Sequence, residues 1–428
     1  MPVPYIDTYY RRTLTTEDPC PPLSGSHTAD ICVVGGGLAG ITAALELARR
    51  GRQVVLLEGR RIAWGASGRN GGFVSPGYAT SLGAIEKLAG RDDAASLYRL
   101  SMEGVRVVAD NIRDLAIAEA VPIPGIIGAI RHDGGAGLQA YRDRMERDFG
   151  RKLRFMPRDE VRTVLLSPKY HQALHDTDAF HFHPLNYARA LVREFRRLGG
   201  RVHEDSLVTG ATLDGPRKAV TTAGGQIDCG DVVFAGGGYT DQVCPALRRA
   251  FLPIATYVLL TEPAADRIAG AIRTTAAIGD DRRAGDYYRV VGGDRILWGG
   301  RITTRTSDPR DLANRLRHEM VTTYPQLADL KVEIAWSGLM SYARHLMPQI
   351  GRLQPGVWYC TAFGGHGMNT TAIGGKVIAE AIAGDSDRYR LFAPFGLAWN
   401  GGPFGRAAAQ LTYWTYQAMD AWRERKAA

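Results

Sequence analysis

The sequence predicts an α/β fold in which a Rossmann-like domain, built from three separate parts of the chain, carries an inserted α+β domain on a mixed or antiparallel sheet. An apolar strand, a glycine-rich turn, a helix and a second apolar strand follow one another between residues 30 and 58. Similar patterns return within residues 183–238 and 357–384. The intervening stretch 252–343 is instead rich in β-branched and aromatic residues, which is typical of an inserted sheet.

The first unit is predicted to begin near His27, because residues 18–26 are rich in proline and turn-forming residues. A short apolar strand over 30–34 precedes a helical stripe that ends at Gly51. An apolar strand then returns over 53–58. Parallel strands need such a crossover helix, so this is a β-α-β unit.

A second unit starts with a helix at His183-Pro184, since proline suits a first helical turn, and it ends at Gly199-Gly200. We expect strands over 201–204, 207–213 and 231–235. Near the C-terminus, a buried strand over 357–363 leads through a glycine-rich turn into a helix that Gly384 closes.

The remaining stretches differ from these units. Residues 84–175 are expected to be largely helical, and residues 286–298 to form a hairpin that turns at Gly292-Gly293. The tail is expected to end in a surface helix over 407–422. The predicted parts are a lead-in (1–27), a discontinuous nucleotide-binding domain (28–83, 176–251 and 344–384), a substrate domain (84–175 and 252–343) and a helical tail (385–428).

Composition excludes several classes of protein. Among 428 residues, 45% are hydrophobic and 23% charged, as in globular proteins, and no apolar run is long enough for a membrane span. Five cysteines lie far apart without a Cys-x-x-Cys pair, and the start does not resemble a signal peptide. We expect a cytoplasmic protein. The net charge of +9 is scattered, so no nucleic-acid partner is expected, and the oligomeric state stays open.

The turn between the first strand and helix reads Gly-x-Gly-x-x-Gly, and Glu58 ends the next strand. The first glycine allows the tight turn, the second lets a pyrophosphate approach the backbone, and the third lets helix and strand pack closely. Glu58 would accept hydrogen bonds from ribose hydroxyls. This pattern predicts a dinucleotide site for NAD or FAD, the alternative being a tight structural turn. Its residues are Gly35, Gly36, Gly37, Leu38, Ala39 and Gly40, with Glu58.

A second small-residue loop follows closely. Many glycines beside one arginine suit a backbone that wraps around a phosphate and a flat ring, although a flexible loop is the alternative. The candidate cofactor-binding residues here are Gly59, Arg60, Gly65, Ala66, Ser67, Arg69, Asn70, Gly71 and Gly72.

Residues 58–72 resemble the D-amino-acid-oxidase-like superfamily of FAD-dependent oxidoreductases, and most of all its γ-glutamylputrescine oxidase branch. Further matching pieces follow in the family's order, at residues 183–187, 208, 234–237, 336–338, 348–351 and 364–367. The resemblance covers about residues 28–385. It implies FAD as the cofactor, with Val208, Ala235 and Gly236 near its adenine side.

The turn at residues 364–371 precedes the last helix of the predicted core, so its N–H groups could face a negative charge. The resemblance places it beside the flavin atoms N1 and O2, where charge develops on reduction. An ordinary glycine turn is the alternative, and His366 could be held by backbone partners. The residues expected at the cofactor are Gly365, His366, Gly367, Met368, Asn369 and Thr370.

Catalytic roles are assigned to five residues. An unprotonated amine favours hydride loss, and an aromatic pocket disfavours the ammonium cation. The aromatic candidates are Tyr257, Tyr287, Tyr288, Trp298, Trp336 and Tyr342, at least half of which should be core. Strand alternation lets only one of Tyr287 and Tyr288 face the pocket. The residues assigned to catalysis are His366, Asn369, Tyr288, Trp298 and Arg344.

Two departures from the family pattern restrict the expected class of substrate and the expected mode of flavin attachment. Sarcosine-oxidase-like relatives hold a carboxylate with a lysine at the place of Asn369, so a simple N-methyl amino acid is less expected than an amine or polyamine derivative. Arg344 could still hold a carboxylate, or it is a surface arginine. The cysteine that tethers flavin in that branch is missing, so FAD should be noncovalent. Four histidines at 171–183 lack supporting ligands, and no metal is expected.

These inferences predict a cytoplasmic FAD-dependent amine oxidase that releases an imine and, after reoxidation by O2, hydrogen peroxide. A flavin dehydrogenase that passes electrons from amino acids to a quinone or carrier is one alternative. An RNA-modification flavoprotein is another, and a non-flavin NAD dehydrogenase is a third.

Overall fold

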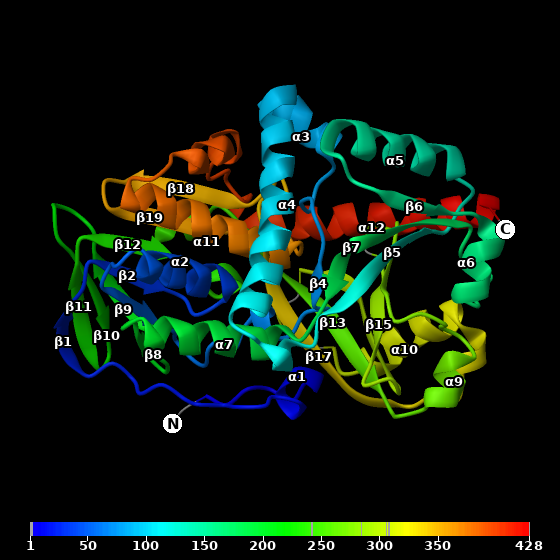
Figure 1. Ribbon diagram of the computed structural model, residues 1–428, viewed down its shortest axis with the longest axis horizontal. Helices are drawn as coiled ribbons and strands as arrows, with labels where there is room; N and C mark the ends of the chain where they lie inside the picture. Colours follow the sequence, from blue (N-terminus) through cyan, green and yellow to red (C-terminus); the bar gives the residue numbers. More distant parts are fainter. Residues whose placement is uncertain (1–2, 241–242, 284, 305, 307–308, 428) are drawn as a thin grey trace.

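The computed structural model describes residues 3–240, 243–283, 285–304, 306 and 309–427. Its strands form three sheets of four, six and nine members. Figure 1 shows the six-stranded sheet with its helices at one end of the long axis and the nine-stranded sheet at the other, with α4 (Arg91–Asp114) between them. The fold is thus the predicted α/β arrangement, a Rossmann-like part joined to a second part built on a mixed sheet.

The six-stranded sheet carries the β-α-β unit of the sequence. Val33 pairs with Leu56 on one side and with Val233 on the other, in parallel register. Helices α2, α7 and α11 pack around its apolar core. In sheet order the strands are β18 (Gln349–Gln354), β19 (Val357–Thr361), β12 (Asp231–Phe234), β2 (Ile31–Val34), β3 (Val54–Leu57) and β8 (Arg201–His203). The helices are α2 (Leu38–Arg49), α7 (Pro184–Arg197) and α11 (Gly367–Ala383).

The nine-stranded sheet is mixed. Strands β14 and β5 pair in parallel, and the other pairs are antiparallel. The predicted hairpin is confirmed, with Gly292 and Gly293 at positive φ between β15 and β16. In sheet order the strands are β17 (Val332–Tyr342), β13 (Leu252–Thr261), β16 (Arg295–Thr303), β15 (Tyr287–Val291), β14 (Ala277–Asp280), β5 (Ile123–Ile130), β7 (Gln172–His181) and β4 (Phe73–Val74), and β6 (Leu153–Met156) pairs with β7.

The smaller sheet consists of β1, β11, β10 and β9. Their bounds are β1 (Gly25–Thr28), β9 (Val208–Thr212), β10 (Lys218–Thr222) and β11 (Gly225–Cys229). The other α-helices are α1 (Tyr9–Arg12), α3 (Leu82–Ala89), α4 (Arg91–Asp114), α5 (Gly135–Phe149), α6 (Arg158–Val164), α8 (Pro245–Arg248), α9 (Ala265–Ala269), α10 (Leu312–Thr323) and α12 (Gly402–Ala427). Short 3₁₀ helices are η1 (Ala66–Gly68), η2 (Ala118–Ala120), η3 (Gly237–Tyr239), η4 (Pro325–Leu327) and η5 (Arg388–Phe395).

Two local expectations need adjustment. The stretch 84–175 is largely helical, as predicted, through α3, α4, α5 and α6, but it also contributes β5, β6 and the start of β7. Pro124 and Gly125 obscure the strand pattern of β5, and Gly125 has a φ of +98° at a break in its register. The lead-in is also ordered well before His27. Tyr10 is fully buried, and its hydroxyl donates a 2.6 Å hydrogen bond to the carbonyl of Asn70.

The proposed two-domain division rests on which sheet each segment joins. The six-stranded sheet draws its strands from residues 31–57, 201–234 and 349–361, whereas the nine-stranded sheet draws most of its strands from 123–181 and 252–342. The predicted domain boundaries do not follow the sheets everywhere. Strand β4 lies within 28–83, which is assigned to the nucleotide-binding domain, yet it pairs with β7 of the nine-stranded sheet.

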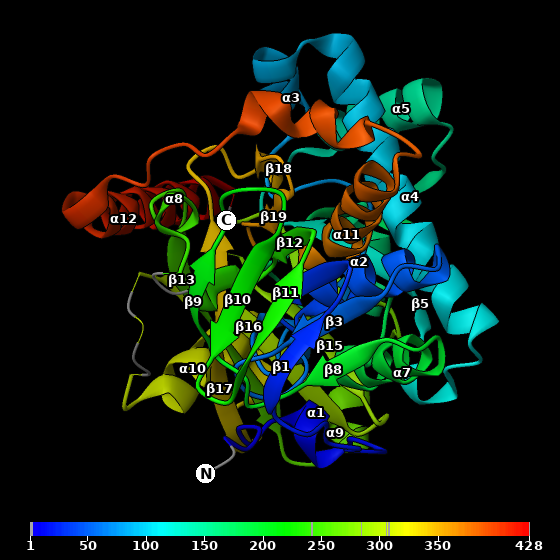
Figure 2. The same cartoon turned by 90° about the vertical axis from the view of Figure 1, so that its left-hand side faces the viewer.

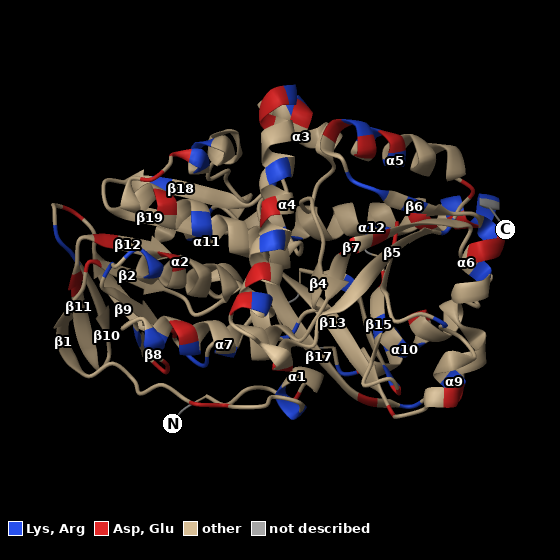
Figure 3. Cartoon of the chain, viewed as in Figure 1, with Lys and Arg blue, Asp and Glu red and all other residues tan. Residues whose placement is uncertain are grey.

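Helix α12 is longer than predicted and lies at the outer edge of the molecule (Figure 2). Figure 3 shows basic and acidic residues interspersed over most of the ribbon. Within the described part of the chain, no helix is both long and apolar enough to cross a membrane. The described residues also contain no cluster of three or more histidine, cysteine, aspartate or glutamate side chains suited to a metal ion.

Candidate active site

A cavity of about 1580 Å³ lies between the six-stranded and nine-stranded sheets. Its floor includes Val34, Leu57 and Phe234, which end the parallel strands β2, β3 and β12. Ligands of open α/β sheets bind at these carboxyl ends. The opposite wall comes from β13, β15, β16 and β17, and one side is closed by α12. The fold therefore brings both parts of the molecule to one cavity.

The glycine turn at the start of α2 is shaped by close backbone contacts. Gly35 has a φ of +112°, and a Cβ there would lie 2.7 Å from the carbonyl carbon of Ala235. A Cβ at Gly40 would collide with the Gly35 carbonyl oxygen. At Gly37, by contrast, a Cβ would meet only Ser67 Oγ, at 3.2 Å. The turn thus requires glycine at positions 35 and 40 for folding and leaves open space over position 37.

Glu58 lies at the end of the cavity that contains the glycine turn. Its Oε2 accepts the Gly36 N–H at 2.7 Å and its Oε1 accepts the Arg60 N–H at 2.9 Å. Burial raises the pKa of the Glu58 carboxyl to about 7, although the two backbone N–H donors oppose the shift. Gly59 and Arg60 line the cavity beside it, and the Arg60 guanidinium lies 3.7 Å from the Trp64 ring centroid.

The loop from Gly65 to Gly72 is held by its own polar side chains. Asn70 Nδ2 donates to the carbonyls of Ala66 and Ser67 at 2.8 and 2.9 Å, and its Oδ1 accepts the Gly72 N–H at 2.7 Å. Ser67 Oγ accepts the Leu38 N–H at 3.0 Å, which joins this loop to the glycine turn. The loop is therefore a preformed wall, and Gly65, Ala66, Gly71 and Gly72 line the cavity with Ser67 and Asn70.

Arg69 connects the loop to β17. Its Nε donates to the Trp64 carbonyl at 2.6 Å and its Nη1 to the Ser337 carbonyl at 3.2 Å. Trp336 Nε1 donates to the Arg69 carbonyl at 2.9 Å. Arg69 lines the cavity but is 94% buried, at 6% exposure, so it also positions the wall. Trp336 belongs to the core, as expected for half of the aromatic candidates.

The expected adenine-side residues lie at the same end of the cavity as Glu58 and the glycine turn. Val208, Ala235 and Gly236 all line it, next to Leu207 and Tyr239. Tyr239 packs edge-on against Trp64 with ring centroids 5.4 Å apart, and its hydroxyl accepts the Leu339 N–H at 3.3 Å. This end is walled by short apolar side chains and glycine backbone.

The turn before α11 faces β17. Gly365 has a φ of +85°, and a Cβ there would lie 2.6 Å from Tyr342 Oη and 3.1 Å from Met340 Sδ. His366 lines the cavity, and its Nε2–H donates to the Ser75 carbonyl at 3.0 Å. Burial lowers the pKa of His366, so its imidazole is neutral at pH 7. Gly365, Gly367 and Met368 line the cavity with it.

Asn369 and Thr370 do not line this cavity, which corrects their expected place at the cofactor. Asn369 is 1% exposed, and its Nδ2 donates to the carbonyls of Gly77 and Ser101 at 3.2 Å each. The Thr370 hydroxyl donates to the His366 carbonyl at 2.5 Å, within the first turn of α11. Asn369 is a positioning residue that holds the loop containing Gly77, because its two donors are directed away from the cavity.

Tyr288 and Trp298 are also corrected. They lie on the face of the nine-stranded sheet that packs against α10, in a separate apolar core, and neither lines the cavity. Their rings stack at 4.1 Å, and the Tyr288 hydroxyl lies 2.9 Å from that of Tyr170 and 2.7 Å from that of Tyr324. Strand alternation gives the cavity Tyr287 instead, because the opposite face of β15 is the one exposed to it.

Tyr287 and Tyr342 form the aromatic wall. The Tyr287 ring packs against Gly71 and Gly299, where any side chain would collide with it, and edge-on against Phe73 at 5.8 Å. Its hydroxyl lies 3.3 Å from Thr256 Oγ1, and burial raises its pKa to about 12. Burial also raises the pKa of Tyr342. Both phenols are therefore neutral at pH 7. Of the other aromatic candidates, Tyr257 is core.

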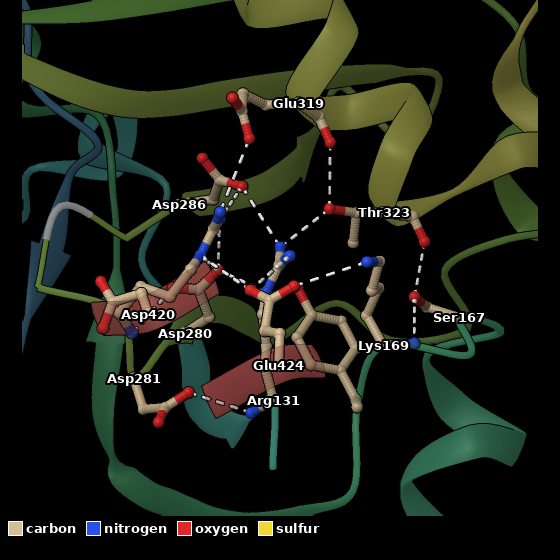
Figure 4. Close-up of polar contacts among 12 residues, drawn as sticks. Arg131, Ser167, Lys169, Asp280, Asp281, Asp286, Glu319, Thr323, Asp420 and Glu424 are labelled. Atoms are coloured by element: carbon tan, nitrogen blue, oxygen red, sulfur yellow. Dashed lines mark hydrogen bonds and ion pairs between the residues drawn. The ribbon is translucent and has the colours of Figure 1, made fainter. Parts of the chain in front are cut away.

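Charged groups gather where the cavity reaches β14 and α12. Asp280 and Arg282 line it there, within a buried network with Arg131 that Figure 4 shows. Arg282 Nη2 lies 2.7 Å from Asp280 Oδ2, and Arg131 Nε lies 3.0 Å from the same oxygen. The other members of the network are Asp286, Glu319, Glu424, Arg301 and Lys169. Opposite charges are paired throughout, so this end is polar without a large net charge. Arg344 lines the cavity from an exposed position.

Most of the chain matches a known protein family. Residues 30–381 match the family described as FAD dependent oxidoreductase (DAO). The chain belongs to this family.

Relatives of this FAD-dependent oxidoreductase agree with that assignment. The gamma-glutamylputrescine oxidoreductase of Escherichia coli (strain K12) is 34% identical over 391 residues, covering 91% of this chain and 92% of that protein. Two solved structures share the fold at low identity. Glycine oxidase from Geobacillus kaustophilus has a TM-score of 0.72 at 18% identity and covers 87% of this chain and 99% of its own. L-proline dehydrogenase from P. horikoshii has a TM-score of 0.70 at 19% identity, with coverages of 88% and 100%.

The cavity of this FAD-dependent oxidoreductase fits its cofactor. The space over Gly37 at the N-terminus of α2 is what a pyrophosphate needs, since backbone N–H groups and the helix dipole favour an anion there. Glu58, at the end of β3, is the acceptor suited to ribose hydroxyls. The residues that line the cavity and would hold FAD are Gly35, Gly37, Leu38, Ala39, Glu58, Gly59, Arg60, Ser67, Val208, Ala235, Gly236, Gly365, His366 and Gly367. Gly36 and Gly40 shape the turn without lining the cavity.

Sequence reasoning missed several lining residues of this FAD-dependent oxidoreductase. Residues 78–81, Asp280, Arg282, Tyr413 and Tyr416 all line the cavity. The tail was expected to be a surface helix, yet Tyr413 and Tyr416 turn inward. Their spacing of three residues on one helical face was the available signal.

Proposed function

We propose that this FAD-dependent oxidoreductase oxidises the carbon–nitrogen bond of an amine, with an extended polyamine derivative as its substrate class. The product is an imine, which water converts to an aldehyde or ketone. Bound FAD would accept the hydride from the carbon next to the amine nitrogen, and O2 would then reoxidise it with release of hydrogen peroxide. The cytoplasm is the compartment we propose.

The observation that carries this proposal is the aromatic wall opposite the His366 turn. Tyr287, Tyr342, Met340 and Phe363 line the cavity there, and both phenols are neutral. A free alkyl amine has a pKa of about 10.4 in water. An apolar wall disfavours its ammonium form, so it raises the fraction of neutral amine from which hydride can leave.

The charged end of the cavity supports a long substrate. Asp280 and Arg282 line the same cavity as Tyr342 and His366, so one molecule can reach both regions. A polar head group would find hydrogen-bonding partners near Asp280 and Arg282, while its amine end lies at the aromatic wall. The 34% identity to a gamma-glutamylputrescine oxidoreductase supports such an elongated amine.

The chain's own residues have separate tasks in this scheme. The aromatic wall orients the reacting carbon and excludes water, and the Nε2–H of the neutral His366 donates a hydrogen bond to the Ser75 carbonyl, which fixes the turn. Arg344 reaches the cavity from an exposed position and is available to a carboxylate on the substrate.

An amine panel tests the proposal. The holoenzyme is mixed anaerobically with γ-glutamylated and free diamines, N-methyl amino acids, glycine and proline, and the flavin absorbance is followed. We expect the fastest reduction with the long amines that carry a polar head. Faster reduction by glycine, proline or an N-methyl amino acid would contradict the proposed substrate class.

The electron acceptor is tested in the same reaction. Oxygen consumption with one hydrogen peroxide formed per amine oxidised is expected. A dehydrogenase that passes electrons to a quinone or carrier would instead reduce an artificial dye while oxygen stays unchanged, and that result would contradict the oxidase assignment.

A further inference from the structure

The outward face of α12 is apolar. Its large members have exposed fractions between 44% and 78%, and successive members are seven, three, five and three residues apart, which places them on one side of the helix. These residues are Phe404, Leu411, Trp414, Met419 and Trp422. Isolated exposed apolar residues are ordinary, but a continuous stripe marks an interaction surface. We call these five residues the outer stripe.

The opposite face of α12 holds the helix against the protein. Gly405 is buried, and Tyr413 and Tyr416 line the cavity. Both acidic residues of the helix also point inward. Asp420 accepts the Arg283 N–H at 3.2 Å, and Glu424 lies 3.5 Å from an Nη of Arg131. The orientation of α12 is therefore fixed by its polar and aromatic inner face, which leaves the outer stripe in solvent.

Basic residues accompany the outer stripe. Arg406, Arg423, Arg425 and Lys426 are exposed, and within the described part of the chain none of them forms an ion pair with a carboxylate. Lys426 Nζ lies 4.0 Å from the centre of the Trp422 ring. Because both acids face inward, the exposed surface of α12 carries aromatic, apolar and positively charged side chains together.

We propose that α12 docks on an anionic lipid surface through the outer stripe. Tryptophan, phenylalanine and leucine insert at the boundary between headgroups and acyl chains, and flanking arginine and lysine attract anionic headgroups. A spanning mode is excluded by the polar inner face, in keeping with the absence of a membrane-crossing helix among the described residues.

The charge distribution favours lipid over a second copy of the chain. Two copies paired through α12 would bring these unpaired basic residues near one another, whereas anionic headgroups neutralise them. Ala408 and Thr412, beside the stripe, line the cavity, so docking would bring the α12 side of the cavity next to the membrane. This inference does not depend on the identity of the substrate.

Vesicle sedimentation tests the proposal. The full-length holoenzyme is mixed with vesicles of equal parts phosphatidylglycerol and phosphatidylcholine, and separately with vesicles of phosphatidylcholine alone. We expect sedimentation with the anionic vesicles that weakens as salt is raised. Brominated lipids should quench part of the tryptophan fluorescence of the unmodified enzyme, which provides a readout without any variant.

Matched variants identify the surface. Trp414→Glu/Trp422→Glu should lower vesicle binding by about tenfold or more, because two carboxylates enter an interface that favours positive charge. Leu88→Glu/Tyr141→Glu adds the same charge at exposed apolar positions on α3 and α5, away from α12, and should leave binding unchanged. Both pairs should keep flavin content and turnover, since none of the four residues lines the cavity.

Three results would overturn the proposal. The first is absence of sedimentation with anionic vesicles. The second is equal loss of binding in both variant pairs. The third is a lipid-free dimer, seen by light scattering, that Trp414→Glu/Trp422→Glu dissociates, because the stripe would then bind a second copy.

Discussion

The Nε2 atom of His366 lies 3.0 Å from the carbonyl oxygen of Ser75. A carbonyl only accepts, so this nitrogen carries the proton, and the lowered pKa keeps the imidazole neutral. The contact joins the turn before α11 to the loop that follows β4, two segments 291 residues apart. Both segments line the cavity, so this hydrogen bond sets the position of the turn relative to that loop.

Replacing His366 should slow the reductive half-reaction. We expect His366→Ala to retain FAD and to slow anaerobic flavin reduction by an amine by about tenfold or more, which is about 1.4 kcal/mol of transition-state stabilisation. His366→Gln should recover part of the rate, because its amide N–H can reach the Ser75 carbonyl. Stopped-flow reduction with measured flavin occupancy checks this, and an unchanged rate in His366→Ala at full occupancy would contradict the assigned role.

Asn369 should affect stability more than chemistry. Asn369→Ala leaves the buried carbonyls of Gly77 and Ser101 without their donors, so we expect a loss of about 1–3 kcal/mol in the free energy of unfolding. Asn369→Asp keeps the shape but presents a carboxylate to two carbonyls, and should destabilise at least as much. Denaturant unfolding measures both losses. A stable Asn369→Ala protein with slowed flavin reduction would restore a catalytic role to this residue.

Substitutions of Gly37 and Gly40 should have different effects, one on FAD binding and the other on folding. Gly37→Val should fold but lose FAD, because its side chain enters the open space needed by the pyrophosphate. Gly40→Ala should not fold correctly, since its Cβ collides with the Gly35 carbonyl oxygen. Flavin absorbance and circular dichroism of both variants test this pair. Normal flavin content in folded Gly37→Val would show that phosphate binds elsewhere.

FAD affinity of the apoprotein should depend on pH through Glu58. Burial raises its pKa to about 7, so the carboxyl takes up a proton as the pH falls through that value. The ionised form accepts hydrogen bonds from ribose hydroxyls as well as from the backbone, so affinity should rise with pH and level off above about 7. Fluorescence titration with FAD measures this. Glu58→Gln should bind more weakly and without that dependence, and an identical pH profile in Glu58→Gln would contradict the assignment.

FAD should be bound noncovalently. Among the described lining residues the cysteine is Cys244, and burial raises the pKa of its thiol, which keeps it protonated and unreactive. Acid precipitation should therefore leave the yellow colour in the supernatant. Colour that stays in the washed pellet would refute a noncovalent cofactor.

The sequence by itself determined the parts whose contacts are close along the chain. The turn from Gly35 to Gly40 and the acceptor Glu58 lie within one β-α-β unit, and local backbone geometry dictates their residue types. The hairpin at Gly292-Gly293 could also be predicted from the sequence, because two adjacent glycines lie between two apolar strands, and both have a positive φ in the structure. Because the glycine turn and Glu58 form a local motif, the sequence also predicted both the protein family and its FAD cofactor.

Only the tertiary structure decided which side chains meet in the cavity. Alternation allowed either Tyr287 or Tyr288, and the choice depends on the distant residues Tyr170 and Tyr324, which bury Tyr288 on the far face of the sheet. Asn369 follows the His366 turn directly, yet its direction is set by carbonyls 268 and 292 residues away. These contacts form when separate segments pack together, so no local pattern in the sequence records them.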